Sequence, residues 1–177
     1  MNGTTNEQWQ ALLFGVRRSI RYHNHRRKFF DALSVWTDFL TIISGGAVVF
    51  FATADKGGPT AVFGGVASLL AALDLVIGFS IKSRDHFDLS RQFSRLEQAM
   101  TLIGDAPSET QLKENINLRL EIELSEPPIK RTLDAYCHNE LICAMGYAET
   151  EKVELTFPQL FLKQFVSIGE YPRKVVR

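Results

Sequence analysis

LSVWTDFLTIISGGAVVFFATA (residues 33–54) and PTAVFGGVASLLAALDLVIGFSI (residues 59–81) are the two stretches that decide the fold. They are 22 and 23 residues long, and each holds one charged residue, Asp38 in the first and Asp74 in the second. As helices rising about 1.5 Å per residue, both would reach roughly 33 Å, more than a hydrocarbon core of about 30 Å. Each stretch is therefore expected to span a membrane.

The segment DKGGP at 55–59 joins the two stretches. Glycine and proline interrupt helices and favour tight turns, so we expect an antiparallel transmembrane hairpin over residues 32–81. The alternative is a buried pair of helices in a soluble protein, which the Gly- and Ala-rich second stretch leaves open.

Averages over the whole chain conceal this division. The 177 residues hold 20 Lys and Arg against 20 Asp and Glu, with a mean hydropathy of −0.04. Zero net charge argues against a nucleic-acid partner, because proteins attracted generally to phosphates are usually basic. Two cysteines exclude a disulfide-stapled secreted scaffold.

Basic residues flank the hairpin on the side away from its turn. Lys82 and Arg84 follow the second stretch, while the turn holds only Lys56. The positive-inside rule then places both termini in the cytoplasm. Nucleic-acid contact is the alternative for the basic run, but its place beside an apolar span favours a topogenic, lipid-facing role. The run comprises Arg17, Arg18, Arg21, Arg26, Arg27 and Lys28.

The two aspartates within the spans are candidate pore or gate residues. In an antiparallel hairpin Asp38 and Asp74 lie at nearly the same depth, where a buried carboxylate is costly unless it faces protein or water. Repeated around an oligomer, such carboxylates could line a cation-favouring path. Pairing with Lys82 or Arg84, or protonation inside the helix bundle, are the open alternatives. One hairpin encloses no path, so conduction requires a homo-oligomer.

Small residues recur along the second stretch. They let helix backbones approach closely in lipid, either within one chain or between copies. The candidate helix-packing residues are Gly64, Gly65, Ser68 and Ala72.

Residues 1–31 are expected to form a basic amphipathic helix and residues 82–177 a cytoplasmic helical region. Two rows of apolar residues recur at helical spacing, and we expect them to pack on each other rather than on the membrane surface. The rows are Trp9, Leu12, Leu13, Val16 and Ile20, and Leu89, Phe93, Leu96, Met100 and Ile103.

Further helices are expected in the C-terminal part, which makes the chain an all-α membrane protein. Ser108 and Gln111 form a capping-box pattern. Residues 116–124 alternate as a strand would, but Leu112, Ile116, Leu120 and Leu124 also form an i+4 row, which favours a helix. We then expect Pro127 and Pro128 to open a helix that Gly146 closes, and a last helix over about 158–168.

The cluster of reactive residue types, Cys137, His138, Asn139, Glu140 and Cys143, does not match a known chemistry. The cysteines lie six residues apart, which is not a zinc-site spacing. His23 and His25 diverge on a helix because they lie two residues apart. We therefore expect no catalytic residue, no metal and no cofactor, and a protein that is not an enzyme.

The order of these features resembles the SLATT family. The resemblance covers about Trp9 to Met100: a basic helix with Arg21-Tyr22-His23 and the run RRKFF at 26–30, a two-span hairpin, and a cytoplasmic helix. It implies a pore-forming effector of bacterial conflict or antiviral systems, located in the inner membrane. No sensor domain is attached here, so a separate sensor protein or nucleotide signal would supply the trigger. A membrane-anchored scaffold without conduction is the main alternative, and a holin a third.

Overall fold

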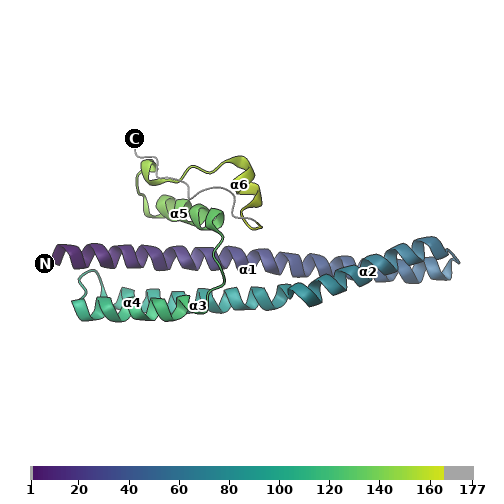
Figure 1. Cartoon of the computed structure of the whole chain (residues 1–177), viewed down its shortest axis with the longest axis horizontal. Coiled ribbons are helices and arrows are strands. Elements are labelled where there is room, and N and C mark those ends of the chain that lie inside the picture. Colours follow the sequence, from purple (N-terminus) through teal and green to yellow (C-terminus); the bar gives the residue numbers. More distant parts are fainter. Residues whose placement is uncertain (1, 166–177) are drawn as a thin grey trace. The chain divides into compact units, whose positions relative to one another are not determined.

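The computed structural model describes residues 2–165, and this range contains helices and no strand. The all-α prediction is confirmed, and residues 116–123 belong to a helix. The elements, drawn in Figure 1, are α1 (Asn2–Thr53), α2 (Gly57–Ile77), α3 (Phe79–Ile103), α4 (Glu109–Glu123), α5 (Arg131–Met145), the 3-10 helix η1 (Glu149–Glu151) and α6 (Phe157–Leu162).

The chain divides into two compact units. The hairpin unit is Arg27–Asp85, and the core unit combines Met1–Arg26 with His86–Arg177. The N-terminal part of α1 therefore belongs to the core unit and the rest of α1 to the hairpin unit.

The turn of the hairpin is shorter than the sequence predicts. α1 ends at Thr53 and α2 begins at Gly57, so residues 54–56 make the turn. Asp55 has a φ of 55°, a left-handed conformation that Asp tolerates better than most residues. Pro59 lies in the first turn of α2, where a helix does not need its N–H group. The prediction that 57–59 break the helix is therefore wrong.

Gly78 interrupts the second expected span. Its φ of 66° is left-handed, and its N–H donates to the Asp74 carbonyl at 2.7 Å, which caps α2. A side chain here would be strained, because L-residues pay about 1–2 kcal/mol in this conformation. Residues 59–81 thus comprise most of α2 and the first residues of α3.

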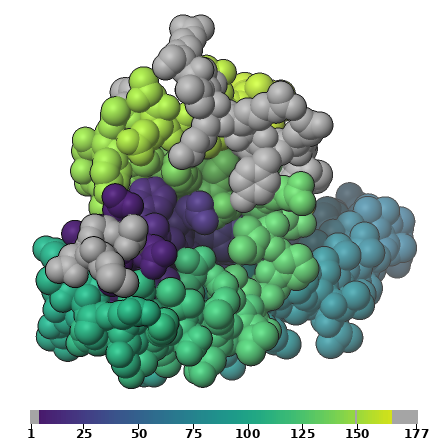
Figure 2. All heavy atoms as spheres, turned by 60° about the vertical axis from the view of Figure 1, so that its left-hand side comes forward, coloured from purple at the N-terminus to yellow at the C-terminus, as the bar shows by residue number. Residues whose placement is uncertain are grey.

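The core unit is built on the two predicted apolar rows. α1 contributes Trp9, Leu12 and Val16, which are buried against Phe93, Leu96 and Met100 of α3 and Leu112 of α4. The Trp9 indole N–H donates to the Gly104 carbonyl at 3.0 Å. In Figure 2 the start of α1, in purple, lies between α3–α4 and the C-terminal segments. Packing of the amphipathic helix on the helix after the hairpin is confirmed.

α4 has the predicted start but a different buried face. The Gln111 N–H donates to Ser108 Oγ at 3.2 Å and the Ser108 N–H to Gln111 Oε1 at 2.8 Å, which confirms the capping box. Leu112 and Asn115 are the buried residues of α4. The rest of the i+4 row is exposed, and Leu124 reaches 88%. The Asn115 amide donates to the Gln111 carbonyl at 2.8 Å, while its Oδ1 atom is buried without a hydrogen-bond partner among the described residues.

Two boundaries near the C-terminus differ from prediction. α5 begins at Arg131, so Pro127 and Pro128 precede the helix and do not open it. Gly146, with a φ of 70°, closes α5 as expected. α6 ends at Leu162, and the predicted extension to 168 lies in part outside the described residues.

Candidate functional site

The outer surface of the hairpin unit is apolar. The most apolar windows of its two long helices are only 6% buried inside the chain, so these helices are not the core of this fold. Both are long and apolar enough to cross a membrane. The exposed residues include Val35, Trp36, Ile42, Val49, Phe50, Val62, Leu69, Leu75 and Val76.

The inner face of α1 in the hairpin carries hydroxyl groups. Ser34, Thr37, Thr41 and Ser44 follow one another at three, four and three residues, which places them on one side of the helix. Ser34 and Ser44 are buried, and Ser34 Oγ lies 2.8 Å from Ser80 Oγ. We call these four residues the hydroxyl row.

The hydroxyl row shares its face with the contacts that join α1 to α2. The Phe51 and Phe63 rings stack with centroids 5.5 Å apart. A Cβ at Gly64 would lie 3.8 Å from Val48 Cγ2, so Gly64 faces α1.

The other predicted packing residues lie elsewhere on α2. A Cβ at Gly65 would meet no atom within 4 Å, and Ser68 and Ala72 are exposed. Of the four predicted packing residues, Gly64 thus packs within the hairpin, and Gly65, Ser68 and Ala72 lie on its outside.

The two candidate pore aspartates are placed differently. Asp74 is partly buried on α2, and its Oδ1 atom is buried without a hydrogen-bond partner among the described residues. No ion pair joins Asp74 to Lys82 or Arg84 within residues 2–165. Asp38 is exposed on the outer side of α1. Both are candidate pore residues from the sequence, but only Asp74 faces the interior of the hairpin.

Several residues of the basic run bind carboxylate or carbonyl groups of the chain itself, so they do not form a free basic face. Arg17 pairs with Glu97 at 2.7 Å and Arg18 with Asp134 at 3.1 Å. Arg26 is buried and donates to the Gln164 carbonyl at 2.7 Å. Burial lowers the pKa of the Arg26 guanidinium.

The remaining basic residues are Arg21, Arg27 and Lys28. Arg21 donates to the Arg17 carbonyl at 3.4 Å, and Arg27 lies 3.5 Å from Asp31. Lys28 is exposed. The topogenic role of the basic run stays a prediction.

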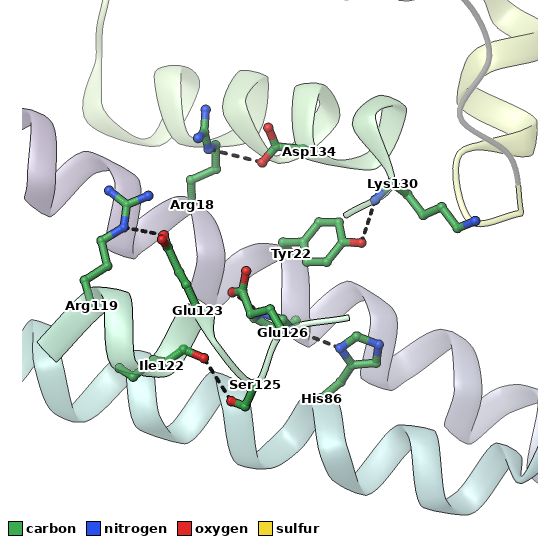
Figure 3. A network of polar contacts seen from close by, with 11 residues as sticks. Arg18, Tyr22, His86, Arg119, Ile122, Glu123, Ser125, Glu126, Lys130 and Asp134 are labelled. Carbon is green, nitrogen blue, oxygen red and sulfur yellow. Dashed lines mark hydrogen bonds and ion pairs between the residues drawn. The ribbon is translucent and has the colours of Figure 1, made fainter. Parts of the chain in front are cut away.

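A chain of buried polar groups lies in the core unit (Figure 3). His23 Nδ1 lies 2.9 Å from His86 Nδ1, and His23 Nε2 lies 2.9 Å from Glu126 Oε1. One tautomer set satisfies both bonds: His86 donates to His23, and His23 donates to the Glu126 carboxylate. Burial, then His23 and Arg26, lower the pKa of His86 to about 3, so it is neutral at physiological pH.

Aromatic rings enclose this histidine pair. Phe93 stacks on His23 with centroids 5.7 Å apart, and Tyr22 packs edge-on against it at 5.3 Å. The Tyr22 hydroxyl accepts the Lys130 N–H at 2.9 Å. Glu126 reaches His23 from the segment before α5. The bond between Tyr22 and Lys130 holds this segment in place (Figure 3).

A second cluster joins α1 to α5. His25 Nε2 lies 2.7 Å from Glu140 Oε2, and Cys137 Sγ belongs to the same group of ligand-type atoms, all within 4.8 Å of one another. Burial, then Glu140 and Asp134, raise the pKa of the Cys137 thiol to about 12. Without a metal this thiol is therefore protonated and unreactive.

His138 and Asn139, from the same cluster at 137–143, make hydrogen bonds to the backbone of the core unit. His138 Nε2 lies 3.1 Å from the Glu151 carbonyl. The Asn139 amide donates to the Val153 carbonyl at 2.7 Å and accepts its N–H at 2.8 Å. Cys143 is exposed. These bonds tie α5 to the segment that follows it.

Sequence reasoning missed the partners of His23 and His25 because they come from remote segments. Glu126, Cys137 and Glu140 lie more than 100 residues away in sequence. His86 did leave a signal, because it lies one heptad before Phe93 and so extends the predicted apolar row of α3.

No protein-family model, curated protein or solved structure matches this chain.

Proposed function

We propose that this chain is a homo-oligomeric pore-forming protein of the bacterial inner membrane, with both termini in the cytoplasm. Several hairpins would assemble so that the polar side chains of α1 and α2 share a hydrated interior. A separate sensor protein or nucleotide signal would trigger opening in an antiviral or conflict system. The resemblance to the SLATT family supports this biological setting.

The observation that carries the proposal is the unpaired Asp74 Oδ1 inside a hairpin with an apolar exterior. An unsatisfied polar atom in hydrocarbon costs several kcal/mol, so a carboxylate there needs water, an ion or another chain. The hydroxyl row lines the same hairpin. Assembly of several copies around water would satisfy the Asp74 carboxylate, whereas a lone hairpin in lipid would leave its Oδ1 atom unpaired.

The test is membrane potential, followed with a voltage-sensitive dye during tightly induced expression in bacteria. We expect the intact chain to depolarise cells before the envelope is lost, and Asp74→Asn to change the rate at least severalfold. Asp55→Asn is the matched control, because Asn tolerates the left-handed turn position. Unchanged depolarisation in Asp74→Asn would contradict the role of this carboxylate.

The outer face has its own test. If Asp38→Asn changes depolarisation and Asp74→Asn does not, the polar path lies on the outside of the hairpin. No depolarisation by verified, inserted protein would contradict pore formation by the chain alone.

A membrane-anchored interaction module is the second candidate. The exposed apolar side chains of α4, which include Ile116, Leu120 and the adjoining Leu124, favour it because such a row fits a partner surface. Exchange of residues 32–81 for an unrelated two-helix hairpin separates the two proposals. Function would survive this exchange in an anchor and would be lost in a pore.

A further inference from the structure

We propose that His25, Cys137 and Glu140 form a binding site for a thiophilic divalent metal ion, of which Zn²⁺ is the best match. The three residues offer one nitrogen, one sulfur and one oxygen within 4.8 Å of one another. This combination suits zinc, whereas Mg²⁺ and Ca²⁺ prefer oxygen ligands alone. The site is independent of the proposed pore.

The backbone positions the three ligands. Cys137 and Glu140 lie three residues apart on α5, which puts both on one face of that helix. His25 comes from α1, and its ring packs edge-on against Tyr136 with centroids 5.5 Å apart. Two helices of the core unit thus supply the ligands.

The ligand atoms, which lie within 4.8 Å of one another, need adjustments of up to about 1 Å to receive an ion. Ligand atoms about 2.0–2.3 Å from a tetrahedral zinc lie roughly 3.3–3.8 Å from one another. His25 Nε2 and Glu140 Oε2 are 2.7 Å apart, so they would separate by about 0.6 Å and replace their hydrogen bond with two metal bonds. The Cys137 thiol would lose its proton to solvent on binding.

The site is open to solvent on one side, so an ion can enter there and bind a further ligand. Cys137 is fully buried, but the His25 and Glu140 side chains are 29% and 35% exposed. Water can therefore supply a fourth ligand from the open side. A cavity of about 770 Å³ adjoins this side and includes Glu140 and Cys143 in its lining.

One neighbouring charge opposes the ion. The Lys163 ammonium lies 3.3 Å from the centre of the Tyr136 ring, and its field reaches both Cys137 and Glu140. A cation in the site would be repelled by Lys163. Replacement by an uncharged residue should therefore tighten metal binding, which a merely structural hydrogen bond between His25 and Glu140 would not predict.

The test uses the full chain in detergent micelles, reduced and without an affinity tag, titrated with Co²⁺. We expect one equivalent to bind and to produce the near-ultraviolet charge-transfer band of a cobalt–thiolate bond, which Zn²⁺ then displaces. Cys137→Ser should lose the band. Cys143→Ser is the matched control and should keep it, because this exposed cysteine lies outside the ligand set.

Because Cys137 is buried, its substitution can disturb the fold. The two partly exposed ligands, His25 and Glu140, therefore provide a second test. His25→Gln and Glu140→Gln should each weaken Co²⁺ binding at least about tenfold while helicity by circular dichroism stays unchanged, and Lys163→Met should strengthen it. Absence of the band at one equivalent, loss of the band in Cys143→Ser alone, or full affinity in both ligand variants would overturn the proposal.

Discussion

In the core unit Trp9 and Phe93 are buried, whereas in the hairpin unit Leu69 and Val76 are exposed and Ser44 is buried. The two units therefore distribute polarity in opposite directions. Burial of apolar surface away from water stabilises the first kind of unit. The second kind has no such stabilisation in water, and its exterior fits the membrane setting that we propose. Polarity, rather than helix content, separates the two.

The largest expected effect is on the core unit. Phe93→Ala removes a fully buried ring between His23 and the apolar row of α1, and should cost about 3–5 kcal/mol of unfolding free energy. Denaturant unfolding in detergent micelles measures this. Phe87→Ala is the control; this ring is 37% exposed and should cost under about 1 kcal/mol.

The second largest expected effect comes from a charge placed on an exposed leucine, which the two units should tolerate differently. Leu69→Arg on α2 should oppose membrane insertion by about 3 kcal/mol. Leu102→Arg, on α3 of the core unit, should change unfolding free energy by less than about 0.5 kcal/mol although Leu102 is even more exposed, 90% against 62%. The fraction of chain that resists carbonate extraction from membranes reports insertion. Equal insertion of both variants would contradict a membrane environment for α2.

The smallest effect is a pH dependence confined to the core unit. His86 has a folded pKa far below its unfolded value of about 6.5, so the unfolded chain binds more protons at mildly acidic pH. Its contribution is complete above pH 6.5 and falls by about 1.4 kcal/mol per unit as the pH drops below that value. His23, Arg26 and Tyr22 face His86, and Glu126 lies on the far side of His23.

His86→Gln separates this dependence from that of other titrating groups. Denaturant unfolding at pH 7 and pH 5.5 should give a smaller difference for the variant than for the wild type. Equal differences would show that His86 keeps an ordinary pKa.

Patterns local in sequence predicted much of this fold. The apolar windows, the rows through Trp9 and Phe93, and the Ser108 capping box all depend on neighbours within a few turns. Asp74 was found because a charge stands out in an apolar run. Which face of α2 it occupies depends on the packing of α1, so the sequence alone does not place it toward the interior of the hairpin.

The unpredicted features depend on contacts between remote segments or on a single backbone angle. Nothing near His25 indicates Cys137 or Glu140, because only the docking of α5 brings them together. Gly78 lies inside the second expected span, and neither its left-handed φ nor its cap on Asp74 leaves a periodic pattern in the sequence.

Trp9 is buried in the core unit and Trp36 is exposed in the hairpin unit, so each unit has its own fluorescent tryptophan. These are the only two tryptophans in the chain, one 1% and the other 61% exposed. In Trp9→Phe the remaining tryptophan, Trp36, lies on the outside of the hairpin. Its emission maximum and its quenching by brominated lipids report whether water or lipid surrounds it. Trp36→Phe leaves an emitter hydrogen-bonded to Gly104, whose emission follows the unfolding of the core unit. The fluorescence of these two variants therefore follows each unit separately.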